Sequence, residues 1–128
     1  MKTAIGLFAL VVSIIGCGTS NSADETMAFI PGTYVREGQH EFGKEHDTLI
    51  ITLQNETAKE YKIERRFLYE RVLDGKPVEP EYKQKETSGT YNPDSKLITE
   101  TQTGKTFSFD AKKGMLFSGP NQFIKIKN

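Results

Sequence analysis

Arginine and aromatic side chains alternate along residues 59–73, where they could bind an anion. The odd positions of this run carry Tyr61, Ile63, Arg65, Phe67, Tyr69, Arg71 and Leu73. A guanidinium group inside a domain needs a carboxylate partner or an anionic ligand, because an unpaired buried charge is very costly. One interpretation is therefore a ligand pocket made by Tyr61, Arg65, Phe67, Tyr69 and Arg71. The favoured alternatives are an internal ion pair with a glutamate such as Glu86 and exposure at a strand end.

Two histidines, His40 and His46, lie among acidic residues in the segment HEFGKEHD. Histidine and carboxylate together could bind zinc or a similar cation. The spacing of the two histidines, however, matches no familiar set of metal ligands. Gly43 between them suggests the tip of a hairpin. We therefore expect a solvated polar loop here and no metal site.

Catalytic motifs do not stand out in the rest of the chain. Ser88, Ser95, Ser108 and Ser118 lie outside any Gly-x-Ser-x-Gly elbow. The chain has no phosphate-binding glycine loop, no CxxC and no HExxH. A catalytic pair cannot be chosen among 17 acidic residues from sequence alone. We expect no enzyme, no catalytic residue and no cofactor.

Cys17 is the one cysteine of the chain and follows a short apolar segment. Lys2 supplies the positive start of a signal peptide, and residues 4–15 supply an apolar core. This core falls well short of the ~20 residues that span a bilayer as a helix. The sequence Ile14-Ile15-Gly16-Cys17 resembles the bacterial lipobox, in which a small residue precedes the acylated cysteine.

The resemblance to lipoproteins implies that residues 1–16 are removed and that Cys17 carries the lipid. Two or three acyl chains, each contributing about 0.8 kcal/mol per buried CH₂, would anchor the protein stably in a membrane. Gly18 follows the cysteine in place of the aspartate that often retains lipoproteins in the inner membrane. The outer membrane of a Gram-negative bacterium is therefore the expected location.

Balanced charge, with 17 basic and 17 acidic residues, argues against nucleic acid as a partner.

The remainder divides into a flexible tether over residues 17–26 and one all-β domain over residues 27–128. Period-two alternation broken by turn residues such as Asp74-Gly75 predicts eight strands. A helix is the rival for the charged run 59–73, but its aromatic odd face favours a strand. No persuasive helical period follows Cys17. The predicted strands cover residues 29–37, 48–54, 59–73, 81–91, 96–101, 105–110, 115–118 and 122–127.

Eight antiparallel strands with short connections must close into a barrel or stack as two sheets. We predict a small meandering barrel, with a two-sheet β-sandwich as the alternative. The motif Gly32-Thr33-Tyr34 at the opening of the first strand, followed by this meander, resembles the lipocalin-type (calycin) barrels of short Bacteroidota lipoproteins. A second Gly-Thr-Tyr occurs at residues 89–91. Each motif is expected to mark a strand with an inward aromatic side chain.

An eight-stranded barrel holds side chains or one small ligand. Because the domain of about a hundred residues contains many large aromatic side chains, the barrel interior is expected to be mostly filled. The leading hypothesis is therefore a membrane-anchored, non-catalytic module of the cell envelope that contacts a protein partner. The alternatives are a lipocalin-like carrier of a small, anionic ligand and an enzyme of unknown type.

Overall fold

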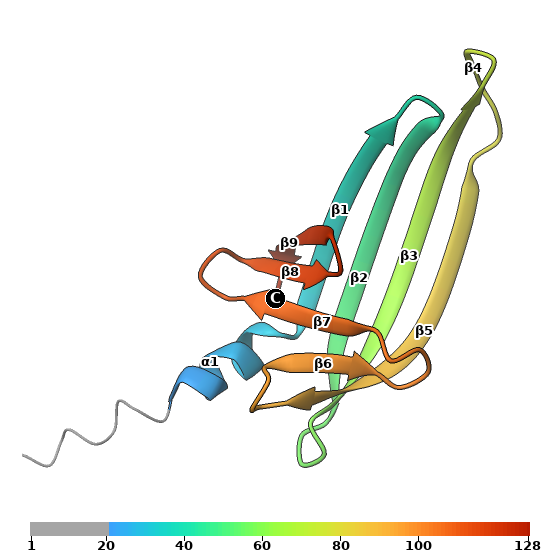
Figure 1. Ribbon diagram of the computed structural model, residues 1–128. Helices are drawn as coiled ribbons and strands as arrows, with labels where there is room; N and C mark the ends of the chain where they lie inside the picture. The colour runs from blue at the N-terminus through green and yellow to red at the C-terminus, as the bar shows by residue number, and fades with distance from the viewer. Residues whose placement is uncertain (1–20) are drawn as a thin grey trace, which may run out of the picture.

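The computed structural model describes residues 21–128, with side chains from residue 25 onward. The expected signal peptide and Cys17 lie outside the described residues. One helix and nine strands occupy the described part (Figure 1). They are α1 (Asn21–Phe29), β1 (Gly32–His40), β2 (Gly43–Asn55), β3 (Glu60–Leu73), β4 (Lys76–Pro77), β5 (Glu81–Asn92), β6 (Leu97–Glu100), β7 (Thr106–Asp110), β8 (Met115–Ser118) and β9 (Asn121–Lys127).

Eight of the strands form a closed antiparallel barrel. Around the ring the order is β1, β2, β3, β5, β6, β7, β8 and β9, and β9 pairs with β1 to close it. The ninth strand, β4, pairs only with the end of β3. The predicted barrel is confirmed, and the two-sheet alternative is wrong. Residues 59–73 form a strand, as their alternation predicted.

The core consists of alternate, inward-facing residues of the barrel strands, as the period of two requires. Tyr34 and Tyr91, the last residues of the two Gly-Thr-Tyr motifs, are both fully buried. The expectation of inward aromatic side chains at both motifs is therefore confirmed. The buried apolar residues are Ile30, Tyr34, Leu49, Ile51, Tyr61, Ile63, Tyr91, Ile98, Phe107, Leu116 and Phe123.

Gly89, in the second motif, lies where neighbouring strands leave no room for a side chain. A Cβ atom there would sit 2.6 Å from Cγ2 of Ile98 and 3.0 Å from the carbonyl oxygen of Thr99. Gly89→Ala is therefore expected to lower the free energy of unfolding by about 2–3 kcal/mol through overpacking. Chemical denaturation measures this change. Gly38→Ala is the matched control, because a Cβ there meets only side-chain ends of Arg36 and Glu45 at 3.3 Å. Equal losses from both substitutions would contradict the prediction.

Helix α1 occupies most of the segment that was expected to be an unstructured tether. The prediction that no helix follows Cys17 is wrong, because residues 21–29 are helical. A nine-residue helix is marginal in isolation, so its stability comes from packing. Met27 and Phe29 pack against the core, and the adjoining Ile30 is fully buried. Pro31 follows directly and favours an extended backbone before it.

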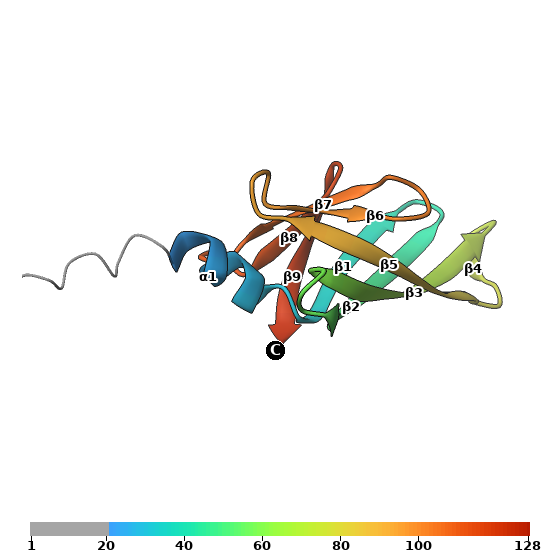
Figure 2. The same ribbon diagram turned by 90° about the horizontal axis from the view of Figure 1, so that it is seen from below.

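Four strands of the barrel are much longer than the other four. β9 pairs with β1 only at residues 33–35, and β6 pairs with β5 only at residues 89–92. Beyond these pairings, β1, β2, β3 and β5 continue together as an open antiparallel sheet (Figures 1 and 2). We call this part the extension; it comprises residues 37–40, 43–46, 66–73 and 81–86. In both views α1 lies at the opposite end of the molecule from the tip of the extension.

Candidate functional site: the barrel mouth and the open face

The extension begins at the mouth of the barrel, where inward positions change from apolar to polar. Inward residues of a strand are two positions apart. On β2 the inward residue that follows Leu49 toward the mouth is Asp47, and on β3 the one that follows Ile63 is Arg65. Further out, the same face of the extension carries side chains that no short strand covers. We call this surface the open face; its residues are Gly38, His40, Gly43, Glu45, Phe67, Tyr69, Arg71, Glu81 and Lys83.

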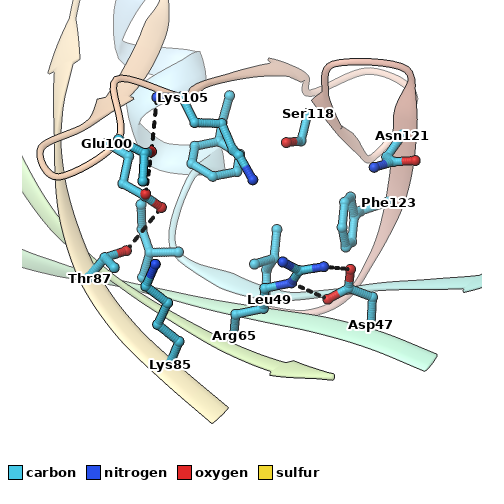
Figure 3. A pocket seen from close by; sticks show the side chains of 13 residues that line it. Asp47, Leu49, Arg65, Lys85, Thr87, Glu100, Lys105, Ser118, Asn121 and Phe123 are labelled. Carbon is cyan, nitrogen blue, oxygen red and sulfur yellow. Dashed lines mark hydrogen bonds and ion pairs between the residues drawn. The ribbon is translucent and has the colours of Figure 1, made fainter. Parts of the chain in front are cut away.

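Arg65 of β3 forms a two-pronged ion pair with Asp47 of the adjacent strand β2 at the barrel mouth (Figure 3). Its Nε donates to Oδ1 of Asp47 at 2.9 Å and its Nη2 donates to Oδ2 at 2.7 Å. Hydrogen bonding to this carboxylate raises the pKa of the Arg65 guanidinium. Nη2 of Arg36 lies 3.6 Å from the same carboxylate, which is only 1% exposed. Asp47 therefore holds two arginines at the point where the barrel opens.

The internal ion pair is present, but the suggested partner is wrong. Glu86 lies on the outer face, where its carboxylate is 3.5 Å from Nζ of Lys62. β3 has β2 on one side and β5 on the other, and the carboxylate comes from β2. Because Nε and Nη2 of Arg65 already donate to Asp47, Arg65 is not free to be the main binding group for an anion.

Aromatic side chains line the open face beyond this ion pair. The guanidinium carbon of Arg65 lies 5.3 Å from the ring centre of Phe67. The ring centre of Phe67 is 6.4 Å from that of Tyr69, which in turn is 5.7 Å from that of His40. Phe67 and Tyr69 are only partly buried. The result is a row of aromatic rings along a curved, accessible sheet.

The five residues predicted for a ligand pocket do not share one cavity. Arg65, Phe67 and Tyr69 follow one another from the mouth along the open face. Tyr61 lies in the core and is 1% exposed. Arg71 is exposed near the tip, paired with Gly43 of β2.

A small cavity of about 90 Å³ opens at the barrel mouth (Figure 3). Glu100, which is nearly buried, accepts hydrogen bonds there from the hydroxyls of Thr87 and Thr103. Among the described residues, Lys85 and Lys105 form no ion pair, although both line the cavity. The charged lining residues are thus three cations and two acids, and both acids are already bonded. The charged and polar lining residues are Asp47, Arg65, Lys85, Thr87, Glu100, Thr103, Lys105, Ser118 and Asn121.

The two histidines lie on strands and not in a loop, so the expected polar loop over this segment is wrong. β1 runs to His40 and β2 starts at Gly43, which leaves only Glu41 and Phe42 in the turn. The side chain of His40 lies on the open face, whereas that of His46 lies on the outer face of the sheet. The two rings therefore point to opposite sides of the sheet and cannot share a metal ion.

His46 gives the protein a pH-dependent contact on the outer face. Its ring bonds to Glu70 and lies 3.5 Å from Glu37, and chiefly the bond to Glu70 raises its pKa. A raised pKa in the folded state means that protonation stabilises the fold. The contribution is complete below the unfolded pKa of about 6.5 and is lost as pH rises through the folded value.

We expect a proton titration by NMR to give His46 a higher pKa than a free histidine. His46→Gln should remove the part of the stability that declines above about pH 6.5. Glu70→Gln provides the matched control, since it keeps the ring but removes the main cause of the shift. An unshifted His46 in the native protein would contradict the assignment.

Sequence reasoning missed Asp47, Lys85 and Lys105. Asp47 was assigned to a loop because its neighbours are charged, although the alternation of Leu49 and Ile51 continues back to it. Lys85 is an even number of residues from Thr87 and Tyr91 on β5, so its side chain lies on the same inner face. The same reasoning could have identified it. Lys105 lies just before β7, and only the pairing of β6 with β7 brings it to the mouth.

Comparison with protein-family models, curated proteins and solved structures finds no match to this chain. Within residues 21–128, no helix has the length and apolar character needed to cross a bilayer.

Proposed function

We propose that this protein is a non-catalytic lipoprotein of the cell envelope that binds a protein partner through the open face. The lipid on Cys17 anchors it in the outer membrane of a Gram-negative bacterium. The lipobox-like sequence Ile14-Ile15-Gly16-Cys17 supports the anchor. The uncovered inner face of the extension supports the partner.

The observation that carries the proposal is that four strands run past the barrel they belong to. A barrel needs only the strand length that its short members cover, so the extension adds nothing to closure. Its inner face carries Phe67 and Tyr69, and its tip exposes Phe42 and Leu73 by 59% and 49%. Aromatic side chains contribute much of the binding energy at protein interfaces, and here they are accessible on a paired sheet.

The size of the cavity favours a partner over a carried ligand. Pockets for small molecules typically span about 300–1,000 Å³. The cavity at the barrel mouth holds about 90 Å³, and the barrel interior is filled by aromatic and aliphatic side chains. The carrier hypothesis therefore ranks second.

The placement of the helix also supports the proposal. The described chain starts with α1 at one end of the barrel, and the extension points away from the other end (Figure 1). A lipid attached shortly before α1 would leave the open face on the side remote from the bilayer.

Partner capture from the envelope tests the proposal. A photo-crosslinking amino acid at position 69 should yield a specific adduct in living cells. Phe67→Ser combined with Tyr69→Ser should reduce recovery of that partner at least tenfold in a pull-down from detergent-solubilised envelope, because each lost aromatic anchor costs about 1–2 kcal/mol or more.

Ile124→Ser is the matched control, because Ile124 is also 57% exposed but lies on β9, outside the extension. It should leave recovery unchanged. Capture that survives the double substitution, or that fails equally with the control, would refute the open face as the binding surface. Circular dichroism of each variant checks that the barrel is intact.

A further inference from the structure

One edge of the extension, on β5, has no neighbouring strand. β5 pairs with β3 from residue 81 to residue 90 without a register shift, whereas β6 pairs only with residues 89–92. Residues 81–86 are all exposed. A strand edge of this kind presents unpaired backbone groups that can bind another extended chain.

The hydrogen bonds at the paired end identify which backbone groups are free. The N–H of Tyr91 points to β3, since it donates to the carbonyl of Lys59 at 2.9 Å. The carbonyl of Ser88 points the other way and accepts from the N–H of Thr101 at 2.9 Å. Because backbone direction alternates along an antiparallel strand, the N–H and C=O groups of Tyr82, Gln84 and Glu86 point outward from the sheet.

The charge beside this edge selects the kind of chain that could pair with it. Lys83 and Lys85 lie on the inner side of the edge, with the single acid Glu81 at its far end, and Lys105 lies beyond the two lysines at the cavity. None of the three lysines forms an ion pair among the described residues. On the outer side Gln84 bonds to Glu64 at 2.7 Å and Glu86 pairs with Lys62, so no charge is left over there.

We propose that an acidic, extended segment of the partner adds to β5 as a further strand, with its inward carboxylates against Lys83, Lys85 and Lys105. This inference rests on the proposed function, because it specifies the partner segment. The cavity of about 90 Å³ between Lys85 and Lys105 has room for a few waters or one carboxylate. Main-chain hydrogen bonds supply the affinity and the alternating side chains supply the selectivity.

A second copy of this chain fits the edge poorly. Antiparallel pairing of two β5 edges about Gln84 would place Lys83 of one copy opposite Lys85 of the other, and like charges directly opposite destabilise a sheet. The edge of β1 at residues 36–40 is also open, but Arg36 is held by Asp47 and Glu37 lies beside His46. The β5 edge is therefore the one with unsatisfied charge.

The first test uses the full chain in detergent and two blocked peptides, one alternating threonine with glutamate and one alternating threonine with glutamine. Hydrogen exchange followed by NMR should slow at least tenfold at the amides of Tyr82, Gln84 and Glu86 with the glutamate peptide. The glutamine peptide should bind at least tenfold more weakly. Equal binding of both peptides, or no protection by either, would overturn the proposal. The lysines would then serve to prevent other chains from pairing with the edge.

Substitutions in β5 separate edge pairing from simple charge attraction. Gln84→Pro removes an outward N–H, which an edge strand tolerates, and should abolish the protection. Gln84→Ala loses the same side-chain bond to Glu64 but keeps the N–H, so it should bind normally. Lys83→Gln with Lys85→Gln should weaken binding about tenfold, whereas Lys112→Gln with Lys113→Gln, in the turn before β8, should not.

Partner capture then distinguishes the inference from the function on which it rests. In cells, Gln84→Pro should prevent the crosslink from position 69, and Gln84→Ala should preserve it. If Gln84→Pro leaves the crosslink intact, the partner binds the open face without adding a strand. If no variant yields a crosslink, including the one with native β5, the proposed function itself fails.

Discussion

Replacing Asp47 with alanine is expected to lower the free energy of unfolding by about 3 kcal/mol. The carboxylate is 1% exposed and pairs with both Arg65 and Arg36, whose side chains are 43% and 18% exposed. Removing one partner of a buried ion pair costs about 3–5 kcal/mol, because the remaining charge stays buried without compensation. The lower end applies because Arg65 can regain water. Arg36 has less opportunity, since its Nε is already buried without a hydrogen-bond partner.

Urea denaturation at constant slope measures this loss. Glu86→Ala is the matched control: it removes one carboxylate from an exposed pair with Lys62 and should cost no more than about 0.5 kcal/mol. If the two substitutions cost the same, the ion pair at the mouth contributes no more than a surface pair. Asp47→Ala should also weaken partner capture, because Arg65 positions the ring of Phe67 beneath it.

Replacing Cys17 with serine is expected to move the protein from the membrane fraction to the soluble fraction. A hydroxyl in place of the thiol takes no diacylglyceryl group, so the acyl chains are never attached. On the proposed function, two or three chains at about 0.8 kcal/mol per buried CH₂ would anchor the native protein stably, and the variant would carry none. Incorporation of labelled palmitate and membrane flotation measure the two effects.

Ser20→Ala is the matched control for this substitution, because it alters a small polar side chain near the same site and keeps the thiol. It should retain both the label and the membrane location. Palmitate on the Cys17→Ser protein, or its absence from the native one, would refute lipidation. Membrane attachment that persists without the label would point to another anchor.

The strands that build the closed barrel could be predicted from turns and alternation. Residues 115–118 form β8 as predicted, and Asp74-Gly75 takes the positive φ angles, 51° and 75°, of a tight hairpin turn. The start of β2 was missed by five residues. A strand is recognised in a sequence by the alternating apolar residues of its buried face. Residues 43–46 lack this pattern because they lie in the extension, where β1 and β3 pair with their backbone but no layer covers their side chains.

The site was only partly predictable for a related reason. Alternation placed Arg65 correctly on the inner face, but sequence separation did not identify which neighbouring strand supplies its partner. Asp47 lies 18 residues away from Arg65 and Glu86 lies 21 away, and both distances suit an antiparallel neighbour. On β5, however, Glu86 is an odd number of residues from the inward Tyr91, so alternation itself places Glu86 on the outer face. The helix α1 was missed because packing, and not its own sequence, stabilises it.

The pairing of β1 with β9 has a consequence for the order of folding. The first and last strands are neighbours, so the ring stays open until residues 121–127 have been made and are free to dock. Such a contact, distant in sequence, is slow to form because a long loop must close first. If the chain is exported unfolded, as the proposed function implies, this delay would keep the barrel from closing before β9 has crossed the membrane.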